Sequence, residues 1–181
     1  MKIKYLGTAA YEGVPALFCN CEVCKKSRAA GGRNLRTRSQ ALVDDKIMID
    51  FNPDTVIHTM TYGVDWEKID GVIITHSHCD HLFPDDAEIA TGCYSHDHRK
   101  INFYSGKAGY DMLKPHTIDR DKEKTSLTLV EPLKKFKVGE YDILPLPADH
   151  GRDTSPVIYS IAKDGKRMLY AHDTGVFLPQ T

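Results

Sequence analysis

The stretch Ile74-Thr75-His76-Ser77-His78-Cys79-Asp80-His81 places three histidines and an aspartate within six residues, at the end of an apolar run that begins at Gly71. A continuous Val and Ile run of this kind predicts a strand buried on both faces, and such a sheet needs helices outside it. The residues after the strand lie at the edge of the sheet, where side chains from several strands can converge. The stretch therefore predicts a layered fold and the position of its functional site.

The spacing HxHxDH suits a pair of metal ions. His76 and His78 can reach one ion together, while Asp80 and His81 can bind a second ion about 3.5 to 4 Å away. Neutral imidazole and carboxylate suit Zn²⁺, Mn²⁺ or Fe²⁺, and no thiolate is required. The alternative is a solvated histidine-rich loop, but the complete spacing and its place after a buried strand favour metal binding. Two further candidate ligands follow later strands: His150 and Asp173.

Length and composition favour one domain, residues 1–181, with a sizeable core. The 24 basic and 25 acidic side chains nearly cancel, so composition gives no reason to expect nucleic-acid or anionic-membrane binding. A small-molecule partner is expected instead, and the oligomeric state stays open, with a homo-oligomer among the alternatives. No apolar run approaches the roughly 20 residues of a membrane span, and the N-terminus lacks a secretory signal, so we expect a cytoplasmic protein.

The elements expected from periodicity are strands, helices and hairpins in an α/β layered sandwich. The expected strands are residues 2–6, 47–51 and 71–75. The expected helices are residues 53–63, with a loose stripe of Val56, Ile57, Met60 and Tyr62, and the weaker candidates 85–90 and 108–113. From Leu127 onward, alternating residues predict hairpins, with Asp164-Gly165 as a tight turn.

The histidine constellation resembles the metallo-β-lactamase fold hydrolases, whose signature is HxHxDH followed by a separate His and a bridging Asp. The resemblance implies an αββα sandwich with two divalent ions. It implies that the first ion is bound by His76, His78 and His150, and the second by Asp80 and His81, with Asp173 bridging the two. It also matches Asp50 with an aspartate that supports a metal ligand from behind; a strand-end cap is the equal alternative for Asp50.

The N-terminal residues carry a narrower resemblance. Gly7-Thr8-Ala9-Ala10 and Gly13-Val14-Pro15-Ala16, followed by Cys19-Asn20-Cys21-Glu22-Val23-Cys24, are similar to the branch containing the phosphoribosyl cyclic phosphodiesterase. Three thiolates at the spacing of Cys19, Cys21 and Cys24 can hold a structural Zn²⁺ if a fourth ligand is supplied from elsewhere. The alternative is a set of buried or free cysteines, which would be prone to oxidation.

The sequence departs from the family pattern at its end. The resemblance expects a last metal-binding His well beyond Asp173, and a His from the same region as fourth zinc ligand, whereas the sequence ends at Thr181. We therefore expect the sandwich to be incomplete in its C-terminal half. The histidines left over lie at other positions, and we expect them to be surface or supporting residues: His58, His96, His98, His116 and His172. The pair His96 and His98 lies in a polar insertion that could contact substrate.

The resemblance implies a metal-dependent phosphodiesterase that acts on a small cyclic or diester phosphate through a hydroxide shared by two ions. Asp80 could also orient that hydroxide, and the basic loop 33–39 could contact phosphate, although a solvated or salt-bridged loop is the more common role. One alternative is a thioester or lactone hydrolase, or a tRNA 3′-processing endonuclease, of the same fold. Another is a noncatalytic metal-binding accessory protein.

Overall fold

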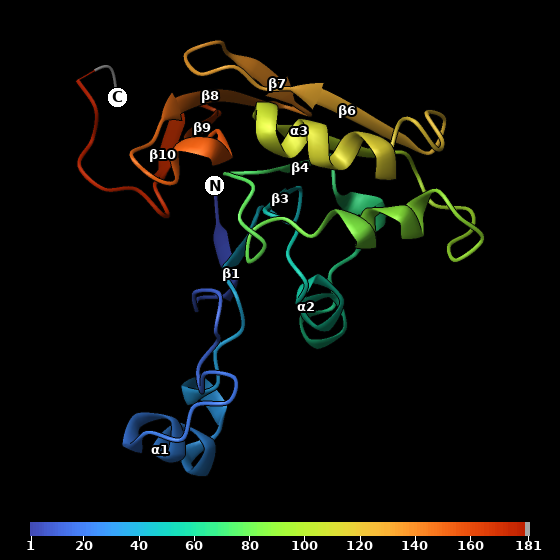
Figure 1. Ribbon diagram of the computed structural model, residues 1–181. Coiled ribbons are helices and arrows are strands. Elements are labelled where there is room, and N and C mark those ends of the chain that lie inside the picture. The colour runs from blue at the N-terminus through green and yellow to red at the C-terminus, as the bar shows by residue number, and fades with distance from the viewer. Residues whose placement is uncertain (180–181) are drawn as a thin grey trace.

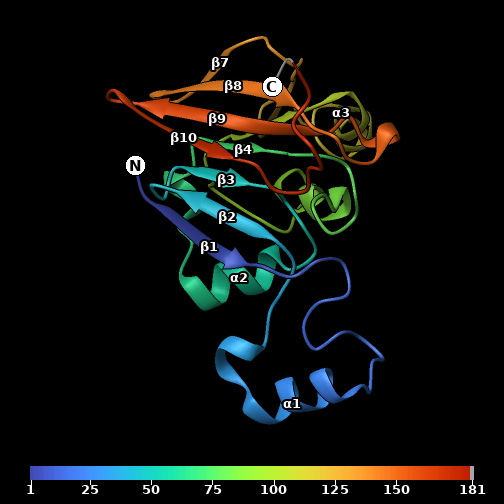
Figure 2. The same ribbon diagram turned by 90° about the vertical axis from the view of Figure 1, so that its left-hand side faces the viewer.

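The computed structural model describes residues 1–179, which form two β-sheets with helices outside the larger one (Figures 1 and 2). The first sheet has the strand order β1-β2-β3-β4-β5-β6, and the second has the order β10-β9-β8-β7. The strands of the first sheet are β1 (Ile3–Gly7), β2 (Gln40–Val43), β3 (Ile47–Ile49), β4 (Gly71–Ile73), β5 (Ile101–Ser105) and β6 (Thr125–Leu129). Those of the second sheet are β7 (Phe136–Val138), β8 (Tyr141–Pro147), β9 (Val157–Lys163) and β10 (Lys166–Tyr170).

The helical segments are short. The α-helices are α1 (Glu22–Ala30), α2 (Thr55–Tyr62) and α3 (Lys107–Leu113). The 3-10 turns are η1 (Gly32–Asn34), η2 (Trp66–Lys68), η3 (Pro84–Ala90), η4 (Lys114–His116) and η5 (Arg152–Thr154). Within residues 1–179, none of these helices has the length and apolar character needed to cross a bilayer.

The first sheet changes direction halfway across. β1, β2 and β3 pair antiparallel, whereas β3 to β6 run parallel and are joined by crossovers on the helical face. The carboxyl ends of β3 and β4 therefore lie side by side, which is where open α/β sheets place their ligands. Residues 71–75 form the predicted buried strand, although its regular part ends at Ile73.

Alternation along the strands divides the core into two layers. Ile47, Ile49 and Ile73 lie in the cluster between the sheets, together with aromatic and aliphatic residues of the second sheet. Met48 and Val72, on the opposite face of the same strands, lie in the cluster beneath the helical layer. The strands are buried on both faces because each face packs on a different layer, which confirms the α/β layered sandwich.

The second sheet is an antiparallel meander. Lys163 pairs with Lys166 across the turn, and Asp164 and Gly165 both have positive φ, at 50° and 70°. That conformation matches the right-handed twist of the strands on either side. The hairpin predicted at Asp164-Gly165 is confirmed.

Helix α2 is present where it was expected but is oriented differently. It ends with Gly63 in the left-handed conformation, φ 62° and ψ 46°, close to the predicted boundary. The residues of its apolar stripe are nevertheless exposed, with Met60 at 69%. Thr55 and His58 are buried instead, because this face of α2 packs on polar side chains of β2 and the β3–α2 loop.

Two elements differ from the sequence-based expectation. Residues 85–90 form the 3-10 segment η3 rather than a regular helix. Helix α1 was not predicted; with the loops around it, it forms an arm that projects away from the sheets, drawn in blue in Figures 1 and 2. The arm is defined here as residues 10–36. It carries all three clustered cysteines.

Candidate metal centre

The turn after β4 presents the three histidines of HxHxDH. The backbone N–H of His81 donates to the carbonyl of His78 at 2.9 Å, which closes the turn. The N–H of Phe51 donates to the carbonyl of His81, also at 2.9 Å, and so ties the turn to the segment after β3. The N–H of Val157 donates to the carbonyl of Thr75 at 2.9 Å and ties it to the second sheet. The histidines are therefore held between two sheets.

One cluster of ligand atoms comes from His76, His78 and His150, whose ring nitrogens all lie within 4.8 Å of one another. His76 Nε2 is 3.0 Å from His78 Nδ1, and His150 Nε2 is 3.1 Å from the same atom. Ligand atoms around a tetrahedral zinc ion, with Zn–N bonds of about 2.0 Å, lie roughly 3.3 Å apart. The spacing suits one ion.

Two loops close this cluster. The N–H of Gly175 donates to the carbonyl of Asp149 at 2.9 Å, and the N–H of Asp149 donates to Thr174 Oγ1 at 3.1 Å. Gly151 has φ 36°, and a Cβ there would lie 3.0 Å from His78 Cε1. A residue with a side chain at position 151 would therefore be strained and would press on the ring of His78.

A second cluster comes from His76, His81 and Asp173, whose ligand atoms also lie within 4.8 Å of one another. Asp173 Oδ2 is 3.1 Å from His81 Nε2 and 3.8 Å from His76 Nε2. The same oxygen is 3.8 Å from His150 Nε2. One carboxylate oxygen therefore lies between the histidines of both clusters.

Asp50 fixes the orientation of His81 from behind. The Asp50 side chain is fully buried; its Oδ1 accepts from Thr75 N and Thr75 Oγ1, both at 2.8 Å. Its Oδ2 lies 2.7 Å from His81 Nδ1, which therefore donates to it. This leaves His81 Nε2 facing Asp173. Among the described residues, His81 Nε2 is one of two buried side-chain atoms without a hydrogen-bond partner, the other being Tyr170 Oη.

The ionisation of the clusters follows from burial and from the close packing of charges. Burial, with His81, His150 and His78 nearby, lowers the pKa of His76 to about 3. Burial also opposes charging of His81, but the carboxylates of Asp50 and Asp173 outweigh it and raise the pKa of His81 to about 10. The charged ring of His81, whose Nε2 is 3.1 Å from Asp173 Oδ2, holds the pKa of Asp173 well below its usual range. A neutral imidazole, an ionised carboxylate and an orphaned ring nitrogen fit a cation, which would replace the proton on His81.

Comparison with known proteins identifies the family of this chain. The family model described as the β-lactamase superfamily domain matches residues 46–181. This chain belongs to that family. Members of the family are hydrolytic metalloenzymes, and the expected metallo-β-lactamase fold is confirmed.

The alignments with individual relatives include most of this chain but a smaller share of each relative. A diphosphatase from the PhnP family is 23% identical with a TM-score of 0.70, over 88% of this chain and 61% of its own. Zn²⁺-bound PqqB from Methylobacterium extorquens is 16% identical with a TM-score of 0.73, over 93% of this chain and 64% of its own. An octanoyltransferase from Porphyromonas gingivalis is 29% identical over 163 residues, which are 84% of this chain and 31% of the relative. The chain thus spans under a third of that relative.

Two residues of this β-lactamase superfamily domain, Asp80 and His172, lie differently from what the sequence led us to expect. Asp80 is buried, with Oδ2 3.6 Å from His81 Nε2, at the margin of the second cluster rather than within it. His172 was left over as a spare histidine, yet its Nε2 is 3.2 Å from Asp173 Oδ1 and its ring centroid is 5.5 Å from that of His81. Its position next to Asp173 in the sequence was the available signal.

The other spare histidines lie away from the clusters. His58 lies on the buried face of α2, and Nδ1 of His116 is 2.8 Å from Glu88 Oε1. The ring nitrogens of His98 lie 2.8 Å and 3.0 Å from the backbone carbonyls of Arg99 and Ala90. Both ring nitrogens of His58 and of His98, and Nδ1 of His116, thus have partners outside the clusters, which favours a supporting role. His96 is exposed in the same insertion as His98.

The three cysteines form a separate cluster on the arm. The sulfurs of Cys19, Cys21 and Cys24 lie within 4.8 Å of one another, and within residues 1–179 no fourth histidine, cysteine or carboxylate joins them. Cys21 is the N-cap of α1, where the backbone N–H of Cys24 and the neighbouring thiols lower the pKa of Cys21 to about 7. A lowered thiol pKa favours the thiolate that binds metal.

The basic loop 33–39 is partly engaged in structural contacts. Arg38 Nη1 lies 3.0 Å from Asp54 Oδ1, and its Nε donates to the carbonyl of Tyr11 at 2.9 Å. The guanidinium of Arg38 therefore joins the base of the arm to the start of α2. This agrees with the salt-bridged alternative for the loop rather than with a phosphate site at Arg38.

Proposed function

We propose that this member of the β-lactamase superfamily is a metal-dependent phosphodiesterase that hydrolyses a small cyclic or diester phosphate. The observation that carries the proposal is the position of Asp173, whose Oδ2 lies 3.1 Å to 3.8 Å from ring nitrogens of three histidines belonging to both clusters. A carboxylate in that position can neutralise two cations at once. The fold similarity to a PhnP-family diphosphatase supports the phosphate substrate class.

In this proposal the first ion is held by His76, His78 and His150. The second is held by Asp80, His81 and Asp173, with Asp173 shared. The ions are Zn²⁺ or Mn²⁺, with Fe²⁺ as a further candidate, and Cys19, Cys21 and Cys24 hold a structural Zn²⁺ with a fourth ligand. When bound, two divalent ions acidify a shared water and stabilise charge on phosphate oxygens.

The residues of the chain supply orientation and access. Asp50 keeps the Nδ1 proton of His81 and so directs Nε2 into the site. His76 and His81 are buried at the base of the site, whereas the side chains of His150 and Asp173 keep 31% and 29% of their surface exposed. A phosphate ester can therefore approach from the side of His150 and Asp173. Asp80, at the margin of the second cluster, is placed to orient the attacking water.

The test is turnover of bis(p-nitrophenyl) phosphate and of a ribose cyclic phosphate by protein loaded with Zn²⁺ or Mn²⁺. We expect Asp173→Asn to lower kcat/KM more than about 100-fold, since it removes the charge shared by both ions. The matched control is Asp142→Asn, an exposed strand aspartate that pairs with Lys137, which should keep wild-type activity. Absence of turnover by the metal-loaded wild type, or full activity of Asp173→Asn, would refute the proposal. A count of only one tightly held ion outside the cysteine cluster would favour the accessory-protein alternative.

A thioester hydrolase is the second candidate, favoured by an apolar pocket. The pocket has a volume of about 320 Å³ and lies between α2 and η3, with Phe51, Trp66 and Phe103 among its lining residues. Its size is at the lower end of the range for small-ligand sites, roughly 300 Å³ to 1,000 Å³. Phe51 directly follows Asp50 in the sequence, and the relative named as an octanoyltransferase suggests an acyl substrate.

Two neighbouring residues of α2 allow a matched test of the thioester candidate. Val56 lines the pocket, whereas Ile57 does not, and both are exposed to a similar degree, at 49% and 45%. If the pocket holds an acyl chain, Val56→Trp should lower hydrolysis of an octanoyl thioester at least about 10-fold relative to an acetyl thioester, while Ile57→Trp leaves the ratio unchanged. Equal rates for the two variants, or no thioesterase activity, would eliminate this candidate.

A further inference from the structure

A buried chain of hydrogen bonds links helix α2 to the metal centre through the backbone of Asp50. His58 is 2% exposed and Gln40 is fully buried. His58 Nδ1 lies 2.6 Å from Gln40 Oε1, and Gln40 Nε2 donates to the carbonyl of Asp50 at 3.0 Å. Gln40 Nε2 also donates to Thr55 Oγ1 at 2.8 Å. Among the hydrogen bonds described for residues 1–179, those of His58, Gln40 and Thr55 do not reach a candidate metal ligand. Only Asp50 bonds to one, His81.

The direction of each bond is determined by chemistry. The carbonyl of Asp50 can only accept, so Gln40 must present its amide nitrogen there and its oxygen to His58. His58 Nδ1 must therefore carry a proton. Burial lowers the pKa of His58, against a smaller opposing effect of Asp54, so the ring is neutral and Nε2 accepts from Thr37 Oγ1 at 2.6 Å. The network has one consistent arrangement of protons.

This arrangement bears on Asp50 because the backbone of Asp50 is unusual. Asp50 has φ 69°, in the left-handed region that residues with a side chain rarely adopt. Its N–H donates to the carbonyl of Ile73 at 2.9 Å, and its carbonyl accepts from Gln40. Both backbone groups are thus held by neighbours, and this conformation directs the carboxylate at Thr75 and His81.

We propose that Gln40, oriented by His58, is a positioning residue for the second metal ion. It holds the left-handed backbone of Asp50, Asp50 in turn holds the Nδ1 proton of His81, and His81 Nε2 is thereby kept facing Asp173. The inference rests on the metal centre of the proposed function. It gives His58 a role in the site although its ring lies outside both ligand clusters, and it distinguishes the two ions, since only the second uses His81.

The experiment compares the two ions within one molecule. Co²⁺ is titrated into metal-free protein against a competing chelator, with the visible absorption of each site as readout. We expect Gln40→Met, which keeps the shape but loses the amide, to weaken the second ion about 10-fold to 100-fold and leave the first within about twofold. Gln40→Glu, which still accepts from His58 but cannot donate to Asp50 when ionised, should show the same selectivity. His58→Gln, which can still donate an N–H to Gln40, should restore most of the affinity lost in His58→Leu.

Thr55→Val is the matched structural control. Thr55 is 3% exposed and belongs to the same network, but it contacts Gln40 and the carbonyl of Asn52 rather than Asp50. It should lower Tm without changing the ratio of the two affinities. If Gln40→Met weakens both ions equally, or if Thr55→Val shifts the ratio as much, Gln40 is only a packing residue and the proposal fails.

A metal-free readout separates this inference from the proposed function. In proton NMR of the metal-free protein, the His81 Nδ1 proton should be shifted downfield and protected from exchange in wild type and Thr55→Val. It should be lost to exchange in Gln40→Met. Should the wild type bind no ions while this pattern holds, the metal centre is wrong and the positioning of His81 stands; an unchanged His81 proton in Gln40→Met overturns the positioning itself.

Discussion

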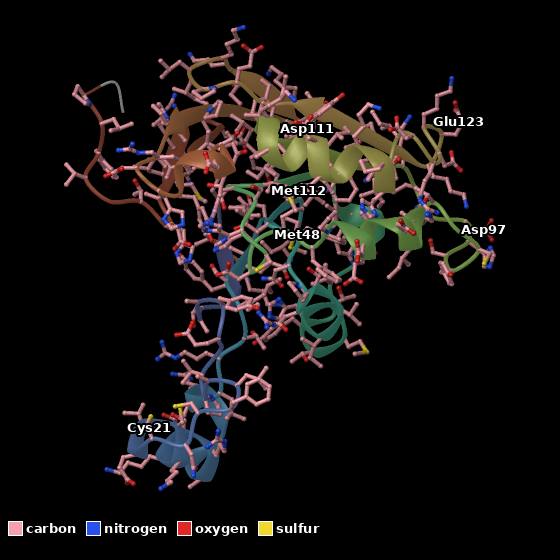
Figure 3. The ribbon with its side chains drawn as sticks, viewed as in Figure 1. Cys21, Met48, Asp97, Asp111, Met112 and Glu123 are labelled. Atoms are coloured by element: carbon pink, nitrogen blue, oxygen red, sulfur yellow. The ribbon has the colours of Figure 1, made fainter. Side chains whose placement is uncertain are left out.

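The histidine centre and the cysteine cluster are both short ligand motifs, yet the molecule supports them differently. The histidine centre draws its ligand atoms from segments far apart in the sequence and rests on Asp50, which is fully buried. The cysteine cluster takes all its sulfurs from six consecutive residues on the projecting arm, where Cys21 is exposed (Figure 3). The comparison teaches that one centre depends on the folded core and the other on a local loop and one helix turn.

The largest effect should come from removing the support of the histidine centre. Asp50→Ala leaves the buried Nδ1 of His81 and the N–H of Thr75 without their acceptor. Breaking a buried pair of this kind costs about 3 kcal/mol or more, so we expect a marked loss of stability together with loss of the second ion. Chemical denaturation and metal counting by plasma mass spectrometry measure the two effects. Retention of both stability and two ions would show that Asp50 is only a strand-end cap.

The second effect is a pH optimum of stability in the metal-free protein. His81 has a folded pKa of about 10 against a usual value of 6.5, so its contribution is fully present below pH 6.5 and is lost as the pH rises towards 10. His76 has a folded pKa of about 3, so it costs nothing above pH 6.5 and destabilises progressively as the pH falls towards 3.

We therefore expect stability of the metal-free protein to be greatest near pH 6.5, measured by urea denaturation in the presence of a chelator. Substitution of His81 by Asn should flatten the alkaline side of the profile and leave the acidic side. A profile that keeps rising above pH 8 in the wild type would contradict the assignment.

The third effect concerns the arm. Simultaneous substitution of Cys19, Cys21 and Cys24 by Ser should remove one bound Zn²⁺ and increase proteolytic cleavage within residues 10–36. Turnover by the histidine centre should stay within about threefold of wild type, because no ligand of that centre comes from the arm. Loss of activity equal to that of Asp173→Asn would show that the two centres are coupled and that the comparison is wrong.

The smallest effect should come from the exposed apolar residues of the arm. Phe18 is 95% exposed, so Phe18→Ser should change the free energy of unfolding by no more than about 0.5 kcal/mol. Leu6 in the first sheet is 2% exposed, and Leu6→Ala should cost about 2 kcal/mol or more. Thermal unfolding of the two variants checks the contrast between arm and core.

The sequence predicted the buried strands well, but it did not predict which face of helix α2 packs on the sheet. The Val and Ile run at 71–75 identified a strand buried on both faces, because such a run has no polar side to expose. Residues 47–51 were predicted only as a strand, and β3 is fully buried as well. The stripe on α2 was less informative: Met60 is exposed, and buried His58 bonds to Gln40. Periodicity indicates which residues share a helix face, but it does not say which face the neighbouring strands accept when those strands offer polar groups.

The sequence by itself predicted the donor atoms of the candidate site, because HxHxDH after a buried strand, with His150 and Asp173 at later strand ends, offers imidazole and carboxylate ligands. Tertiary structure decided how those atoms are used. The left-handed backbone of Asp50, the proton on His81 Nδ1 and the approach of His172 to Asp173 depend on contacts between residues on different strands and loops. Spacing along a chain fixes only local geometry, whereas a hydrogen bond between distant segments exists only once the sheets have brought them together.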